Sequence, residues 1–170
     1  SGRGVGPQGF AHRGRDRRQT MGMSIRTSDV IQRPIEDVFT FFVDMENSPT
    51  WGRTARTTKV TEGQVSVGTV FQEELKIMGR SMSSQTEVTE FDPPTRFSYV
   101  GRFGNGWKER ASYTFEPVGD GTRLSLTGTA DMGRFTNFLA PILSLFMKRQ
   151  VNLLLQSLKR VLEAPGKPTA

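Results

Sequence analysis

The sequence predicts an α+β fold in which a curved antiparallel sheet of seven strands wraps around one long C-terminal helix. Three observations predict this fold. Residues 134–163 carry an apolar stripe at helical spacing, residues 54–131 alternate between apolar and polar side chains with short polar connections, and two short helical segments follow the first strand. An antiparallel sheet with one apolar face must bury that face, and the C-terminal helix is the only long amphipathic segment that could cover it.

The C-terminal helix is predicted from a rotation of about 100° per residue. Its expected apolar face consists of Leu143, Met147, Val151, Leu154, Leu158 and Val161. Its expected solvent face consists of Lys148, Arg149, Asn152, Gln156, Lys159, Arg160 and Glu163. Pro141 predicts a kink or a new helical start, and Pro165 with Gly166 predicts the end of the helix.

The first strand is expected from Ile25 to Gln32, because it mixes β-branched and polar residues and stops before a proline. Pro34 suits the first turn of a short helix, where Glu36 and Asp37 are favoured by the helix dipole. A second helical turn is expected between residues 44 and 51. The remaining strands are predicted at Arg53–Glu62, Val65–Met78, Ser81–Phe91, Arg96–Phe103, Trp107–Glu116 and Thr122–Asp131.

Length and charge predict a single domain. A chain of 170 residues suits one hydrophobic core, expected at residues 23–165. Residues 1–22 contain five arginines and one aspartate, and so hold most of the net charge of +6; we expect a disordered or appended basic tail there, and a disordered C-terminus at 166–170. The remainder is nearly balanced and lacks a basic stripe with interleaved aromatics, so we expect no specific nucleic acid as a partner.

Several other partners and compartments are expected to be absent. No apolar run reaches the roughly 18 to 20 residues of a membrane span, and no cysteine is present, which permits a reducing cytoplasm. We therefore expect a cytoplasmic protein without a transmembrane segment, either a monomer or a homodimer. The only histidine, His12, lies in the tail, and acidic residues do not cluster at metal spacing, so we expect neither a metal nor a cofactor.

The order of elements and the residues at their joints resemble the polyketide cyclase/dehydrase-like branch of the SRPBCC superfamily, which includes START lipid-transfer domains and the birch-pollen allergen. The matching segments are residues 31–34 with Val38 and Phe39, then Asp44, Asn47, Pro49 and Trp51, then residues 67–69, 90–96, 121–124, 158–159 and 162–163. The resemblance implies a helix-grip fold enclosing an apolar pocket. Such pockets are used for lipids, sterols, polyketides or plant hormones, and only in some members for catalysis.

Two glutamates are candidate catalytic residues. Glu73 alternates in phase with the apolar positions Phe71 and Leu75, and Glu109 is in phase with Trp107 and Tyr113. A carboxyl group in an apolar pocket has a raised pKa and can act as a general acid or base. The alternative is that either side chain lies at the pocket mouth and pairs with an arginine, such as Arg56 or Arg110.

The other candidate site residues would contact a ligand in a cavity between the helix and the curved sheet. Tyrosine and tryptophan side chains have an aromatic ring with one polar group, which suits contact with an aromatic ligand. Gln150 and Ser157 interrupt the apolar face of the helix. The predicted ligand-binding residues are Trp51, Phe71, Tyr99, Trp107, Tyr113, Phe138, Ile142, Met147, Gln150, Leu154 and Ser157.

Three classes of function stay open at this stage. The first is the binding or transport of a small hydrophobic molecule, a lipid or a polyketide-like compound, without chemistry. The second is a cyclase or dehydratase in which Glu73 or Glu109 moves protons while Tyr99 or Tyr113 polarises a carbonyl. The third is an interaction module of the co-chaperone kind, which would need an exposed partner surface.

Overall fold

The computed structural model describes residues 23–52, 54–77, 80–131 and 140–165. The strands are β1 (Met23–Ile31), β2 (Thr54–Lys59), β3 (Val70–Ile77), β4 (Arg80–Asp92), β5 (Arg96–Phe103), β6 (Lys108–Val118) and β7 (Gly121–Asp131). The helices are α1 (Ile35–Val43), a 3-10 turn (Met45–Asn47), α2 (Ser48–Trp51) and α3 (Ala140–Glu163). The expected tail and C-terminus, and the predicted helical residues 134–139, lie outside the described residues.

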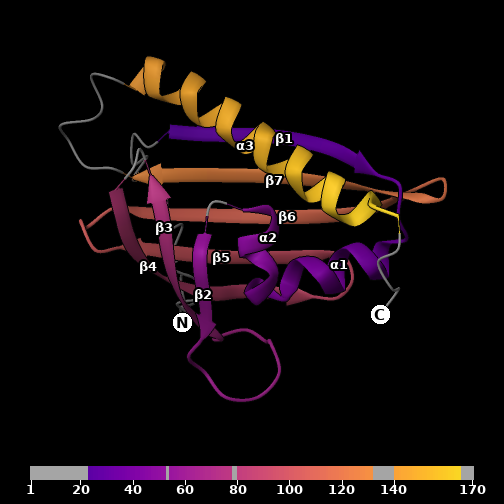
Figure 1. Ribbon diagram of the computed structural model, residues 1–170, viewed down its shortest axis with the longest axis horizontal. Coiled ribbons are helices and arrows are strands. Elements are labelled where there is room, and N and C mark those ends of the chain that lie inside the picture. Colours follow the sequence, from indigo (N-terminus) through magenta and orange to yellow (C-terminus); the bar gives the residue numbers. More distant parts are fainter. Residues whose placement is uncertain (1–22, 53, 78–79, 132–139, 166–170) are drawn as a thin grey trace, which may run out of the picture.

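The seven strands form one antiparallel sheet in the order β1-β7-β6-β5-β4-β3-β2. Figure 1 shows α1, α2 and α3 on the same face of this sheet, with β2 and β3 turned across the direction of β1 and β7. The turn follows from the accumulated twist of neighbouring strands. The predicted seven-stranded α+β architecture, with two short helices after β1 and a long C-terminal helix, is confirmed.

The hydrophobic core lies where α1 and the C-terminal half of α3 meet the middle of the sheet. Phe42 of α1 packs against Phe97 and Phe115, with ring centroids 5.8 and 5.5 Å away. Leu124 of β7 and Leu158 of α3 complete this centre, and both are 0% exposed. Removal of this apolar surface from water is the main stabilising contribution to the fold.

The helix α3 is attached to the edge strand β1 by polar contacts. The Thr27 hydroxyl donates to Asn152 Oδ1 at 2.6 Å, and Lys159 Nζ lies 3.4 Å from Asp29 Oδ1. Both contacts point from the inner face of β1 to the helix. They also fix the direction of α3, whose C-terminal end lies beside the C-terminal end of β1 (Figure 1).

The buried side of α3 includes more than the predicted stripe, of which Leu158 is buried and Val151, Leu154 and Val161 pack against the core. Leu155 and Leu162 are 3% and 6% exposed, although neither belongs to the predicted apolar stripe. Asn152 and Lys159, predicted to face solvent, contact β1 instead. The physical reason is that α3 packs beside a strand whose inner face carries Thr27 and Asp29, so polar helix residues find partners there.

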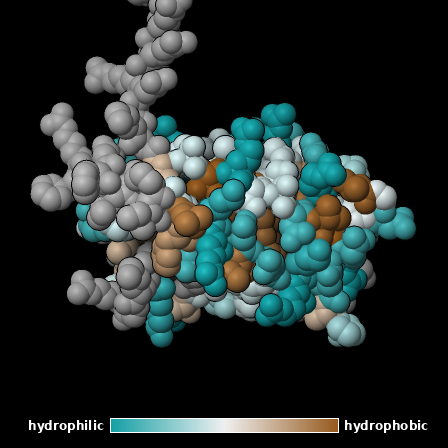
Figure 2. All heavy atoms as spheres, turned by 90° about the horizontal axis from the view of Figure 1, so that it is seen from above, coloured by the Kyte–Doolittle hydropathy of each residue, from teal (hydrophilic) through white to brown (hydrophobic). Residues whose placement is uncertain are grey.

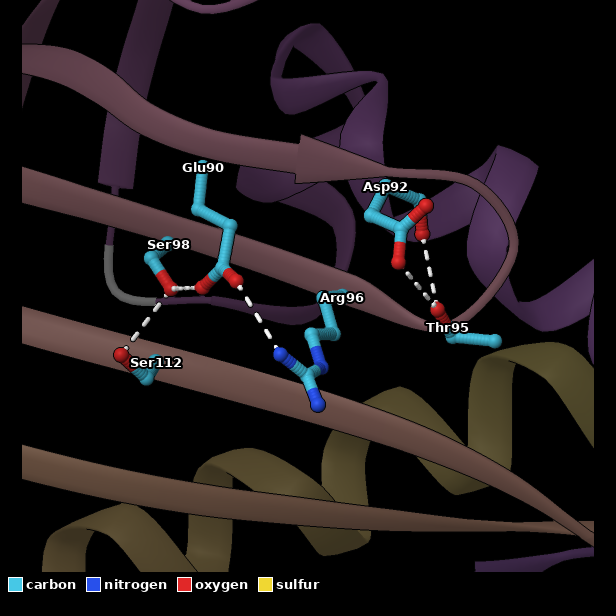
Figure 3. A network of polar contacts seen from close by, with 6 residues as sticks. All are labelled: Glu90, Asp92, Thr95, Arg96, Ser98 and Ser112. Carbon is cyan, nitrogen blue, oxygen red and sulfur yellow. Dashed lines mark hydrogen bonds and ion pairs between the residues drawn. The ribbon is translucent and has the colours of Figure 1, made fainter.

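The opposite face of the sheet is polar and carries an ordinary surface network. Figure 3 shows Ser98 at its centre, where its hydroxyl contacts Glu90 Oε2 at 2.7 Å and Ser112 Oγ at 2.9 Å. Arg96 adds an exposed ion pair to Glu90 at 3.5 Å. Exposed pairs of this kind contribute about 0–1 kcal/mol, so this network orders the surface more than it stabilises the fold.

Candidate functional site

The inner face of the sheet changes character along the strands. Residues paired directly across antiparallel strands share a face, so the register defines rows of side chains that cross the sheet. One row joins Phe97, Tyr113 and Leu126, all less than 5% exposed. Two further rows lie toward the other end of the sheet. They join Val88, Tyr99, Ala111 and Gly128, and then Phe71, Thr86, Gly101, Glu109 and Ala130.

Four of the nine residues in these two rows are glycine or alanine. Ala111, Gly128, Gly101 and Ala130 bring little volume to the space between sheet and helix. This end of the inner face is the candidate site for a ligand.

The first half of α3 is loosely packed beside the edge strand β1. Figure 1 shows this half beyond β1 at the rim of the sheet, whereas the C-terminal half crosses in front of β1 and reaches β7. None of the side chains from residue 144 to residue 150 is buried, whereas Leu155 and Leu158 further along the helix are. The helix is thus packed tightly toward its C-terminal end and loosely toward its N-terminal end.

Glu73 is a buried carboxyl group on β3. Its side chain is 8% exposed, and the Thr86 hydroxyl donates to Glu73 Oε2 at 2.5 Å. Burial raises the pKa of Glu73, while hydrogen bonds from Thr86 and Ser84 act in the opposite direction. Glu73 also pairs across the strands with Thr57 of β2. These contacts hold the carboxyl group on the inner face.

Glu109 lies on β6 in partial contact with solvent. Its side chain passes over Gly101, where an added Cβ would stand 2.9 Å from Glu109 Cγ. Burial raises the pKa of Glu109 to about 7, the negative charge of Glu73 adds to the rise, and a hydrogen bond with Tyr99 opposes it. A carboxyl group with this pKa exchanges a proton readily near neutral pH.

Two tyrosines stand beside the carboxyl groups. Tyr99 and Tyr113 stack with ring centroids 6.1 Å apart and an interplanar angle of 28°. Burial raises the pKa of Tyr99 well above its ordinary value, with the charge of Glu109 as the next cause, and burial also raises the pKa of Tyr113. Both hydroxyl groups therefore stay protonated and act as hydrogen-bond donors.

Trp51 of α2 belongs to the hydrophobic core cluster. It is 7% exposed and stacks on Phe42 with ring centroids 5.5 Å apart. Its Nε1 is the one buried side-chain polar atom for which the described part of the chain offers no hydrogen-bond partner. A buried donor left without a partner costs about 1–3 kcal/mol.

The remaining predicted site residues are distributed unevenly. Phe71 is buried in the row of Thr86 and Glu109, whereas Trp107 lies in the turn between β5 and β6 and is partly exposed. Four partly buried residues follow α3, namely Met147, Gln150, Leu154 and Ser157. Phe138 and the side chain of Ile142 lie outside what the structure describes.

The structure also supplies residues that were assigned no role from the sequence. Thr86 and Gly101 contact the two glutamates directly. Alternation along the strand had already indicated a less polar face for Thr86. Its hydrogen bond to Glu73 depends on a hairpin register that the sequence does not specify, in which Thr86 pairs with Phe71 and Ser84 with Glu73. Arg56 and Arg110, the alternative partners of the glutamates, are both exposed, and the described residues show no ion pair between them and either carboxylate.

A separate groove runs along the outside of the same end, between β1 and α3. Its volume is about 390 Å³, and its lining consists of Ser24, Ile25, Arg26, Ser144, Leu145 and Lys148. Figure 2 looks onto this side and shows hydrophobic atoms in separate patches divided by hydrophilic groups. The exposed apolar side chains of α3, Leu145, Phe146 and Leu153, are 72%, 41% and 50% exposed.

Two further properties concern the described residues alone. They contain no group of three or more histidine, cysteine, aspartate or glutamate side chains that could hold a metal ion. None of their helices is both long enough and apolar enough to cross a membrane.

The fold is of the helix-grip class found in START-related and allergen-like proteins. The protein matches the TTHA0849 protein from Thermus thermophilus with a TM-score of 0.70 and 23% identity, over 85% of this chain and 99% of that one. A START superfamily protein from Mycobacterium smegmatis matches with a TM-score of 0.68 and 14% identity, over 84% and 98% of the two chains. Ara h 8.0201 matches with a TM-score of 0.63 and 14% identity, over 83% and 97%.

The chain belongs to the family described as polyketide cyclase / dehydrase and lipid transport, whose profile matches residues 23–163. No curated protein matches the sequence. At these identities the solved structures show the fold alone. The family is consistent with the binding of a small hydrophobic ligand, and its members' shared architecture agrees with the resemblance found in the sequence.

Proposed function

We propose that this protein binds a small hydrophobic molecule, a lipid or a polyketide-like compound, between the N-terminal half of α3 and the inner face of the sheet. The observation that carries the proposal is the loose packing of α3 from residue 144 to residue 150, where no side chain is buried, together with small residues such as Ala111 and Gly101 on the inner face of the sheet. A compact core would place large apolar residues there, as the chain does around Phe115. Family membership points to the same kind of ligand.

The first test is the mass of the protein purified from cells, measured under native and then denaturing conditions. A bound lipophilic molecule that is released on denaturation supports the proposal and reveals its chemical class. The same native measurement separates a monomer from a homodimer. If the purified protein neither carries a lipophile nor binds an added apolar naphthalene, the binding proposal is wrong.

A second candidate function is a cyclase or dehydratase, and the pKa of Glu109 favours it. A base with a pKa of about 7 can remove a proton from a carbon next to a carbonyl group, while a protonated tyrosine donates a hydrogen bond to the developing oxyanion. Tyr99 hydrogen-bonds Glu109, so the two groups would reach the same part of a substrate. Burial and, next to it, the negative charge of Glu73 keep the pKa of Glu109 in this range.

The enzyme function is tested by replacing each carboxyl group with its amide. Glu109→Gln and Glu73→Gln should abolish turnover of polyketide-like carbonyl substrates while the substrates still bind. Glu74→Gln and Glu116→Gln are matched controls, because both side chains are exposed and each lies on the same strand as one of the candidates. Full rates in both Glu109→Gln and Glu73→Gln would contradict the acid/base role.

A further inference from the structure

The two carboxyl groups of the site differ in the hydrogen bonds that they have left to accept. A carboxylate can accept about four hydrogen bonds. Glu73 is held by the hydroxyl groups of Thr86 and Ser84. Glu109 is hydrogen-bonded by Tyr99 and is also partly exposed, so it retains acceptor positions that a bound molecule can use.

Trp51 has a hydrogen-bond donor left to use, whereas Glu109 has acceptor positions. The indole Nε1 only donates, and it is buried without a partner among the described residues. Buried polar groups are nearly always hydrogen-bonded, so this donor stands out from the other buried polar atoms that the structure describes. An acceptor brought by a ligand would satisfy it.

A series of side-chain contacts connects Trp51 with Glu109. The Trp51 ring stacks on Phe42, Phe42 lies 4.5 Å from Tyr113, and Tyr113 stacks on Tyr99, which hydrogen-bonds Glu109. The same helix α2 is attached next to Glu73, because the hydroxyl groups of Ser48 and Thr57 lie 2.7 Å apart and Thr57 pairs with Glu73. Ring contacts thus link Trp51, through Phe42 and Tyr113, to Tyr99 beside Glu109.

We propose, on the basis of the function proposed above, that the ligand is recognised at two points. It is a planar aromatic molecule with a hydroxyl or amine group that donates to Glu109 and a carbonyl group that accepts from Trp51 Nε1. The ring system between these groups packs against the aromatic rings of the site. Trp51 is therefore a specificity-determining residue and more than a wall of the pocket.

Four naphthalene probes test this recognition, because they share one ring system and differ in polar groups. They are 2-ethylnaphthalene with neither group, 2-naphthol with the donor, 2-acetylnaphthalene with the acceptor, and 6-acetyl-2-naphthol with both. We expect each group to tighten binding about fivefold, the value of one net hydrogen bond, so that 6-acetyl-2-naphthol binds best. Isothermal titration calorimetry at about pH 8, above the raised pKa of Glu109 so that its carboxylate can accept, measures the four dissociation constants.

Two variants assign each group to its partner. Trp51→Phe keeps the stacked ring but removes the N–H, and it should weaken the two acetyl probes about fivefold while leaving 2-ethylnaphthalene unchanged. Glu109→Met should weaken the two naphthols in the same way. Glu116→Met is the control for the second variant, because Glu116 is an exposed residue of the same strand. Binding of 2-ethylnaphthalene also shows that each variant is folded.

The possible outcomes distinguish two-point recognition from the hydrophobic ligand binding proposed above. If all four probes bind equally, or if Trp51→Phe affects the four probes equally, two-point recognition is wrong while hydrophobic binding stands. If none of the probes binds the folded protein and no lipophile is released from it on denaturation, both proposals are wrong. Selective loss of acetyl binding in Trp51→Phe and of naphthol binding in Glu109→Met supports the assignment of both contacts.

Discussion

The two ends of the inner face of the sheet carry different kinds of side chain, although the same strands form both ends. At one end Phe97, Phe115 and Leu124 are 0–2% exposed and meet the buried leucines of α3. At the other end the same strands carry Glu109 and Gly101, and α3 has no buried side chain from residue 144 to residue 150. The first end forms the hydrophobic core, and the second is the site proposed above.

The difference teaches that function and stability need not compete for the same residues. Burying carboxyl groups is costly, and the fold can tolerate Glu73 and Glu109 because a separate apolar core holds the sheet and helix together. The polar contacts of Thr27 and Asp29 with α3 reinforce the well-packed end. Three measurements test whether the two ends differ in this way.

The largest expected effect is on the core. Phe115→Ala removes a ring that is 2% exposed and packs edge-on against Phe39 at 5.1 Å, so it should lower the free energy of unfolding by about 3–5 kcal/mol. Tyr99→Phe, at the polar end, keeps the ring and should change it by less than about 1 kcal/mol. Urea denaturation of both variants measures the two values. Similar losses for the two would show that the ends do not differ.

The next effect is a dependence of stability on pH. Folding raises the pKa of Glu109 from 4.5 to about 7, so the native state binds more protons than the unfolded state between these values. The contribution of Glu109 to the free energy of unfolding should therefore be fully present below pH 4.5 and fall by up to about 3 kcal/mol as the pH rises through 7. Glu73, whose pKa is also raised, contributes with the same sign.

Thermal or urea unfolding of Glu109→Gln across this pH range measures the contribution of Glu109. The variant should lose most of the decline, because glutamine does not titrate. Glu116→Gln is the control and should keep it, since Glu116 is exposed on the same strand. A decline that is identical in Glu109→Gln and in the unmodified protein would show that Glu109 is not held in the inferred environment.

The smallest effect concerns the glycines beneath the site. Gly101→Ala would place a Cβ 2.9 Å from Glu109 Cγ, and we expect a loss of about 1 kcal/mol in the free energy of unfolding together with a displaced carboxyl group. Gly128→Ala is a matched control, because its Cβ would meet only the Arg110 carbonyl oxygen at 3.6 Å. Calorimetry of the two variants should separate them. Equal stability would mean that Glu109 moves aside freely.

Alternation of residue types was enough to predict the faces of the strands. It correctly assigned Glu73 and Glu109 to the inner face together with Tyr99 and Tyr113, because a period of two is set by backbone geometry alone. The six-strand meander and the long helix also followed from hairpin signals and helical periodicity, whereas the pairing of β1 with β7 did not.

Contacts between residues far apart in the chain were not predicted from the sequence. The orientation of α3 was predicted from hydropathy, but Asn152 and Lys159 find partners on β1, more than 100 residues earlier in the chain. The contact between Thr86 and Glu73 likewise depends on strand register, and β4 contains an irregularity between Val88 and Glu90 that shifts its pairing with β5. Such pairings are set by tertiary packing, which local patterns do not encode.

The row that contains Gly101 and Glu109 can vary independently of the rows that contain Phe97 and Phe115, because the two sets lie at different positions along the same strands. A substitution in the first row alters shape, charge and hydrogen-bonding capacity at the site while the second set continues to hold sheet and helix together. Residues at the proposed site can therefore change without altering the residues that stabilise the fold. New ligands can be accommodated by changing a few inward-facing residues at one end, without rebuilding the domain.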